Sequence, residues 1–103
     1  MYIMNIQNKK LWLALATVAP FIDNNDLNGA KGAVFNVLFV AKTKKEFKEK
    51  VRFKLLEFGY VLENLEDIEP FDFKKTYGDN LNNLAEIALQ TENIQWGTFY
   101  IYD

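Results

Sequence analysis

A chain of 103 residues, half of them hydrophobic and 16% aromatic, is long enough to bury one core and too apolar to remain disordered. It contains no cysteine and no histidine, which excludes disulfide frameworks, cysteine- or histidine-based catalysis and the usual zinc sites. The net charge of −2 is unevenly distributed, because residues 1–54 carry a balance of +6 and residues 55–103 a balance of −8. This division favours a bipolar surface that attracts a charged partner, unless the two halves interleave on folding.

The first ten residues are expected to be a short extension of a single domain that spans residues 1–103. Tyr2, Ile3 and Ile6 are candidates for pairing with a sheet edge. The apolar run that follows is only about nine residues long and leads into a polar loop, so it is not typical of a signal peptide. No segment approaches the roughly 20 apolar residues that span a bilayer. We therefore expect a cytoplasmic protein with no membrane partner.

Two strands are predicted next. Residues 11–18 (LWLALATV) are apolar on both faces, which indicates a strand in the centre of its sheet. Residues 20–32 form a loop dense in Asn, Asp and Gly. Residues 33–41 (AVFNVLFVA) are rich in β-branched and aromatic side chains and predict a second strand. We expect the two strands to pair antiparallel.

The segment from Thr43 to Gly59 predicts a helix with both ends marked in the sequence. Thr43 is an N-cap residue and Glu46 follows at the capping-box spacing, so that hydroxyl and carboxylate each satisfy a backbone amide. Gly59 ends the helix in a left-handed conformation. A weaker stripe of Phe53 and Leu56 indicates burial on more than one side. The main apolar stripe consists of Phe47, Val51, Leu55 and Phe58.

Three further elements complete the chain. Residues 60–68 predict a third strand whose acidic side chains place it at a sheet edge, and Pro70 ends it because proline cannot donate to a ladder. Asp79 or Asn80 is expected to cap a second helix. The inner face of that helix consists of Leu81, Leu84, Ala85, Ala88 and Leu89. Residues 95–102 predict a closing aromatic strand.

The chain order is thus β-β-α-β-α-β. It predicts an α+β fold, with a single sheet of about four strands and two helices packed on it. No repeat and no second domain is visible in the sequence.

Acidic residues gather in and just after the predicted third strand. Such a run can be a solvated edge, a docking surface for a basic partner, or a pair of catalytic or metal-binding carboxylates. It lacks the alternation and the central glycine of a calcium loop, which leaves a metal site with the least support. The candidates for partner binding are Glu63, Glu66, Asp67, Glu69 and Asp72.

The loop after the first strand supplies two second-choice candidates, Asp23 and Asp26. Its D-N-N-D-L-N-G sequence misses the alternate ligand positions of an EF-hand and has no closing glutamate. Turn chemistry accounts for these residues, and a loop of this length can also contact a partner. We expect no metal and no other cofactor.

Nucleic acid is not an expected partner. Seven cations lie within residues 42–54, but the pI of about 5.1 is far below that of a typical nucleic-acid-binding domain. The aromatic residues near the C-terminus lack the neighbouring cations that RNA stacking requires. They are Trp96, Phe99, Tyr100 and Tyr102. Aromatic residues are enriched at protein interfaces, so a protein partner or a second copy of the chain suits them better.

One pattern runs from Leu11 to Phe71. It consists of a strand, an Asx/Gly loop, a strand that ends in a T-K-x-E-F helix start, a helix end L-x-x-F-G-Y, and an acidic E-D-I-E-P. The segments that carry it are LWLALATVAPFI, LNGAKGAVFNVLFVAKTKKEFKEKV and LLEFGYVLENLEDIEPF. Together they resemble the small immunity proteins encoded beside bacterial polymorphic toxins of the contact-dependent-inhibition and Maf type.

This resemblance implies a cytoplasmic binding protein, not an enzyme, that neutralises a cognate toxin domain, often a nuclease. A nuclease site is basic because it holds phosphates, and an acidic surface can occlude it or steer association. Reversing the charges of Glu66 and Asp67 is therefore expected to slow association with the toxin. Two other classes stay open. One is a small regulatory or scaffold domain that dimerises through the last strand, and the other is an enzyme that uses only carboxylates, tyrosines and lysines.

Overall fold

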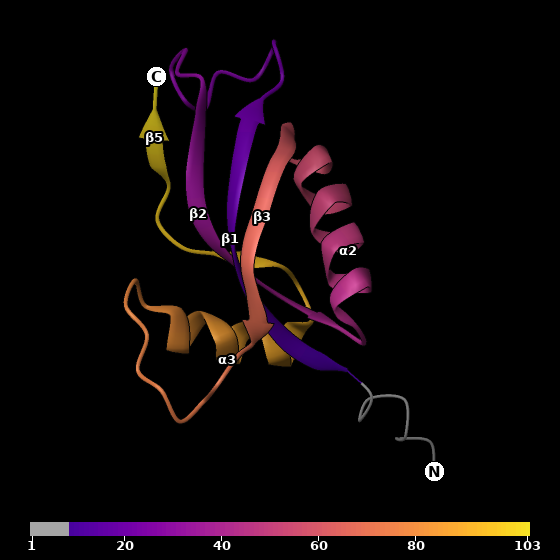
Figure 1. Ribbon diagram of the computed structural model, residues 1–103. Coiled ribbons are helices and arrows are strands. Elements are labelled where there is room, and N and C mark those ends of the chain that lie inside the picture. Colours follow the sequence, from indigo (N-terminus) through magenta and orange to yellow (C-terminus); the bar gives the residue numbers. More distant parts are fainter. Residues whose placement is uncertain (1–8) are drawn as a thin grey trace.

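The computed structural model describes residues 9–103 and shows one antiparallel sheet with two helices (Figure 1). The expected α+β class and the chain order are confirmed, with one more short strand at the C-terminal end. The elements are β1 (Lys10–Pro20), β2 (Gly32–Ala41), α2 (Lys44–Glu57), β3 (Tyr60–Pro70), α3 (Leu81–Thr91), β4 (Gln95–Trp96) and β5 (Tyr100–Tyr102). No helix in this part of the chain is long and apolar enough to cross a membrane. Of the expected N-terminal extension, residues 1–8 lie outside the described residues, and Lys10 already belongs to β1.

Strand β1 lies in the centre of the sheet, as its apolar sequence predicts. The strand order is β3-β1-β2-β4, and β5 pairs with β2 beyond β4. The expected antiparallel pairing of β1 with β2 is confirmed, from Lys10 opposite Ala41 to Val18 opposite Ala33. Strand β3 pairs only with β1, so it is the edge strand that its acidic sequence indicates.

The two helices pack on opposite faces of the sheet. Side chains along a strand alternate between these faces, so neighbouring residues of β1 join different core clusters. Trp12, Ala14, Ala16 and Val18 of β1 join one core cluster with the buried stripe of α2. Leu11 and Leu13, on the other face, join a second cluster with Leu38 and Val40 of β2 and the buried side of α3. In Figure 1, α2 runs beside the strands, whereas α3 crosses only their lower end.

The caps of α2 form as the sequence indicates. The Thr43 Oγ1 atom accepts the Glu46 N–H at 3.1 Å, and the Glu46 carboxylate accepts the Lys42 N–H at 2.7 Å. Gly59 follows the helix with φ +88°, a conformation that glycine adopts without steric cost. These contacts satisfy backbone groups that every helix end leaves without an internal partner.

The expected second buried stripe of α2 is wrong. Phe47, Val51 and Leu55 are fully buried, but Phe53 is 65% and Leu56 38% exposed. Helix α2 contacts mainly β3 and β2 with its buried side, and its outer side is exposed. Phe58, the last residue of the main stripe, is half-exposed and packs edge-on against Trp96.

The start of α3 differs from the expected capped helix. Asn80 is the N-cap residue but lies in the left-handed region with φ 60°, and its side chain makes no capping hydrogen bond. Asp79 does not cap the helix either, because its carboxylate binds Thr98. The inner face is shorter than expected: Leu81, Ala85 and Ala88 are buried, Leu84 is partly buried, and Leu89 is 46% exposed.

The expected C-terminal strand is split into β4 and β5. Residues 97–99 interrupt it, with Thr98 held by the Asp79 carboxylate and the Gly97 N–H bonded to the Asn36 carbonyl. The Phe99 side chain turns to the α2 face, where its ring stacks on Phe35 at a centroid distance of 4.2 Å. The alternation of aromatic residues in the sequence does not reveal this break, because the contacts that cause it come from distant parts of the chain.

Candidate functional site

The α3 side of the sheet is covered over only part of its length. Helix α3 buries the end that contains Leu11, Leu13 and Leu38. Further along the same face, Leu15 and Thr17 of β1 are only partly buried, and so are Val34 and Asn36 opposite them on β2. We call this uncovered half of the sheet the open face. It is where a partner can reach the sheet directly.

Acidic side chains line the β3 side of the open face. Glu66 lies opposite Leu15 and Glu69 opposite Leu13, and directly paired residues project to the same face of a sheet. Glu63 and Asp67 complete the row, and all four carboxylates are exposed. The Asn64 side-chain amide donates a hydrogen bond to the Glu66 carboxylate at 2.7 Å, which restrains that side chain.

Two irregularities shape this row. The β1–β3 register shifts between Leu13 and Leu15 and again between Thr17 and Val18. At the first shift Asp67 has φ 56°, a left-handed conformation that Asp and Asn tolerate better than most residues. A bulge re-aims side chains at a strand edge. Here it places Asp67 and Glu69 in the lining of the same cavity.

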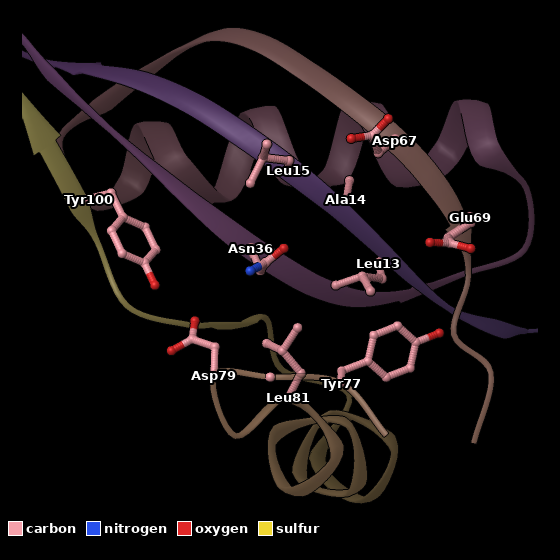
Figure 2. Close-up of a pocket in the computed structure, with 11 residues that line it drawn as sticks. Leu13, Ala14, Leu15, Asn36, Asp67, Glu69, Tyr77, Asp79, Leu81 and Tyr100 are labelled. Atoms are coloured by element: carbon pink, nitrogen blue, oxygen red, sulfur yellow. The ribbon is translucent and has the colours of Figure 1, made fainter. Parts of the chain in front are cut away.

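The cavity has a volume of about 420 Å³ and lies between β3, α3 and β5. Leu13, Leu15 and Leu81 supply apolar surface to it. Figure 2 shows Asp67 and Glu69 on the β3 side, with Asp79 and Tyr100 across the cavity from them. Asn36 and Tyr77 add polar groups to the lining. The cavity thus combines an apolar surface with three carboxylates.

Asp79 is held in a fixed position. Its carboxylate accepts the Thr98 N–H at 2.7 Å and the Thr98 hydroxyl at 2.6 Å. These hydrogen bonds, helped by the Asn36 side chain, lower the pKa of Asp79, because they favour the ionised form. A side chain on Gly97 would collide with this carboxylate, which explains the glycine at that position.

Tyr102 closes the other end of the open face. Its side chain lies over Gly32, where any added Cβ would meet the tyrosine and the Val18 carbonyl. The Tyr102 hydroxyl donates a hydrogen bond to the Glu63 carboxylate at 3.4 Å, so β5 reaches across to the edge strand. Burial, and then the Glu63 charge, raises the pKa of Tyr102.

The structure brings together four of the seven acidic residues predicted from the sequence and separates the other three. Asp72 follows β3, and its carboxylate accepts the Lys74 N–H at 2.9 Å in a local turn. Asp23 and Asp26 lie in the β1–β2 loop, which Figure 1 shows at the opposite end of the sheet from α3. Asp26 accepts the Tyr60 hydroxyl at 3.1 Å, and burial followed by this contact raises the pKa of Tyr60.

The sequence does not place Asp79, Tyr77 or Asn36 in a site, and it indicates Tyr100 only as one of several aromatic residues suited to a protein interface. Asp79 and Tyr77 come from the connector before α3, Tyr100 from β5 and Asn36 from β2. Asn36 is a polar residue within the otherwise apolar sequence of β2, and this contrast is a signal that the sequence offers for it.

Basic residues of α2 lie near the outer side of β3. Lys48 and Arg52 are exposed and line a shallow cleft with Leu62 and Glu63. The basic and acidic halves of the sequence are therefore neighbours in space, and part of the long-range field cancels at this edge. The open face is on the other side of the sheet from α2, and its cavity is lined by no lysine or arginine among residues 9–103.

Across these residues, no group of three or more His, Cys, Asp or Glu side chains is placed to hold a metal ion. Comparison with known proteins finds no matching family model, no matching curated protein and no matching solved structure. The resemblance to toxin-immunity proteins is therefore carried by the sequence pattern alone.

Proposed function

We propose that this protein is an immunity protein that binds a basic toxin domain, such as a nuclease, through its open face. The contact begins at the acidic rim of that face, which is the row of Glu63, Glu66, Asp67 and Glu69. The supporting observation is the uncovered half of the sheet, where four exposed carboxylates of β3 lie beside apolar and aromatic surface. Such a surface combines the long-range attraction that steers association with the apolar area that stabilises a complex.

The arrangement suits binding better than catalysis. The carboxylates of β3 are spread along an exposed edge, whereas catalytic carboxylates usually lie in enclosed sites where burial adjusts their pKa values. The edge is also protected against unspecific strand pairing by its charges, its two register shifts and Pro70. Side chains, and not the backbone of β3, are then the groups offered to a partner.

Co-expression tests the function. The C-terminal domain encoded by the gene immediately upstream is expressed alone and together with this protein, and growth and complex formation are measured. We expect toxicity of that domain alone and relief by a stable 1:1 complex. A harmless neighbour that forms no complex contradicts the proposal.

A charge variant then tests the surface. Glu66→Lys combined with Asp67→Asn removes the negative charge at the centre of the rim, and Asn tolerates the left-handed backbone at position 67. We expect slower association by about tenfold at low salt, with a smaller difference at high salt. Glu49→Lys combined with Glu86→Gln makes the same charge change on exposed helix positions and serves as the control. Equal association rates for both variants contradict the assigned surface.

A second candidate function is a regulatory domain that dimerises through β5. Tyr100 and Ile101 are 60% and 54% exposed on a strand that pairs with β2 on one side only. Light scattering after size exclusion measures the mass directly. A dimer that Ile101→Lys converts to a monomer supports this function, and a monomer at high concentration rules it out.

A further inference from the structure

We propose that a second cavity, on the α2 side of the sheet, receives a cationic side chain, lysine or arginine, of a protein partner. This aromatic cavity has a volume of about 360 Å³ and is lined by the end of α2, the β1–β2 loop, the start of β3 and the C-terminal segment. Its rings belong to the α2 face, so it is separate from the open face. The inference therefore goes beyond the proposed function and does not depend on it. The rings are those of Phe58, Tyr60, Trp96 and Phe99.

The rings leave aromatic surface available to the cavity. One face of Phe99 is covered by Phe35, which stacks on it at a centroid distance of 4.2 Å and an interplanar angle of 6°. Tyr60 and Trp96 meet Phe99 at centroid distances of 5.9 and 6.0 Å, with interplanar angles of 67° and 65°. These two rings thus stand steeply to the plane of Phe99 and do not lie flat on it. The cavity is bordered by aromatic surfaces in several orientations.

Asp26 supplies a carboxylate in a defined position. The Tyr60 hydroxyl donates to its Oδ2 atom at 3.1 Å. The Asp26 N–H donates to the Asn24 side-chain oxygen at 2.9 Å, and the Asn24 amide donates to the Gly59 carbonyl at 2.8 Å, which ties the loop to the end of α2. Within residues 9–103, Asp26 is the one charged residue in this lining and takes part in no ion pair.

Aromatic rings and a carboxylate together recognise an organic cation. The negative face of an aromatic ring attracts a cation, and the carboxylate adds an opposite charge. The methylene groups of lysine or arginine can cover apolar surface while the charged end reaches the carboxylate. A neutral side chain fills the same volume but gains nothing from Asp26, and an anion is repelled by it.

The rim of the aromatic cavity suits a protein partner. Phe58 and Ile101 are 51% and 54% exposed, so apolar surface continues from the lining onto the surrounding surface. Contiguous exposed apolar surface is typical of protein interaction sites. The residues beside an inserted lysine or arginine can cover these two side chains, whereas a free amine leaves them in water.

NMR of the whole protein tests the binding, because the chain contains only two tryptophans and their indole N–H signals are easily followed. Trp96 lines the aromatic cavity, whereas Trp12 is buried and donates to the Ala41 carbonyl at 3.0 Å. The probes are N-acetyl-L-lysine methylamide and N-acetyl-L-arginine methylamide, and Trp96→Phe assigns the signals. We expect a saturable shift of the Trp96 signal and none of the Trp12 signal. The absence of a Trp96 shift with both probes overturns the proposal.

Two further probes separate the charge from the stem and from the peptide groups. N-acetyl-L-norleucine methylamide has the four-carbon stem of lysine without the ammonium group, and at matched ionic strength we expect it to bind at least about fivefold more weakly than the lysine probe. Equal binding shows that the cavity selects apolar volume alone and overturns the cation. n-Butylamine has the charge and the stem without the peptide groups. Binding as tight as that of the lysine probe overturns the assignment to a protein side chain.

Matched variants test the lining. Asp26→Asn keeps an acceptor for Tyr60 and removes the charge, and Phe58→Leu removes a ring and keeps an apolar side chain. We expect each to weaken binding of the lysine probe by about threefold or more. The controls are Asp23→Asn in the same loop and Phe53→Leu on the same helix, both at exposed positions outside the aromatic cavity. Equal losses in the controls overturn the assigned site.

The open-face variant, Glu66→Lys combined with Asp67→Asn, keeps this inference apart from the proposed function. We expect it to bind the lysine probe within about a factor of two of the wild type, because its changes lie on the other side of the sheet. A larger loss overturns the separation of the two surfaces. If co-expression shows immunity but no probe binds, the aromatic cavity is wrong and the immunity function stands. If the probe binds but no toxic neighbour is neutralised, the immunity function is wrong and the cation site stands.

Discussion

The two faces of the sheet use the same strands in different ways. On the α2 face, Ala16 and Val18 of β1, Phe35 of β2, and Phe47, Val51 and Leu55 of α2 are completely buried. On the α3 face, complete burial is confined to the end beneath α3, and Leu15, Thr17 and Asn36 are only partly buried. The difference follows from the helices, since α2 runs beside β3 and also contacts β2, whereas α3 contacts one end of β2, the short strand β4 and, less, β1.

This contrast separates the face that stabilises the fold from the face that we propose for binding. The α2 face supplies most of the apolar burial, which is the dominant favourable term in folding. The α3 face keeps a groove with polar and acidic groups that a closed core would not tolerate without partners. We expect substitutions on the first face to change stability and substitutions on the second to change binding.

The largest effect is expected from Phe47→Ala, which empties the centre of the α2 core where Phe47 packs beside Trp12. The free energy of unfolding should fall by about 3–5 kcal/mol, as measured by urea denaturation. Leu15→Ala on the open face should cost less, about 1–2 kcal/mol, because its side chain is only partly buried. Equal losses would show that the open face is also part of a tightly packed core.

Gly32→Ala tests how tightly β5 packs against β2 at the end of the open face. The added methyl group collides with the Val18 carbonyl and the Tyr102 side chain, so β5 must move. We expect a loss of about 1–3 kcal/mol, typical of overpacking. Adding Tyr102→Ala should recover part of it by removing one of the two collisions. If the double variant regains no stability, the collision with the Val18 carbonyl of β1 alone accounts for the loss.

Substitutions at the starts of the two helices should change stability by an intermediate amount, and differently for α2 and α3. Thr43→Ala removes the hydroxyl that accepts the Glu46 N–H and should cost about 1 kcal/mol. Asn80→Gly at the start of α3 should cost nothing or stabilise slightly, because Asn80 makes no capping hydrogen bond and has φ 60°. Thermal unfolding of both variants measures the difference. A large loss for Asn80→Gly would mean that its side chain holds α3 by another contact.

The smallest effect is a pH dependence at Asp79. Its pKa is lowered in the folded protein, so it adds stability that is present above the unfolded pKa of about 3.9 and is lost as the pH falls through the folded value. Asp79→Asn carries no titrating group there. The wild type should therefore lose more stability between pH 5 and about pH 2 than the variant, by less than about 1 kcal/mol because the site is partly exposed. If the free energy of unfolding depends on pH equally in both proteins, the ionised Asp79 does not contribute to stability.

The parts of the fold that were predictable depend on contacts close in sequence. The α2 caps, the left-handed Gly59 and the central β1 follow from local residue types and periodicity. The cavity was not predictable, because β2, β3, β5 and the start of α3 each contribute one or two residues to it. Asp79 illustrates the limit. It resembles a helix cap in the sequence, but Thr98, 19 residues away, binds its carboxylate instead.

The sequence by itself determined an α+β chain with a capped, core-facing helix and an acidic edge strand, because amphipathic period, caps and charge act within a few residues. Only the tertiary structure decided that the helices occupy opposite faces and that α3 leaves half of one face open. The length and crossing position of α3 fix that outcome, and they depend on packing against β2 and β1. The acidic rim therefore comes from the sequence, and the open face beside it comes from the fold.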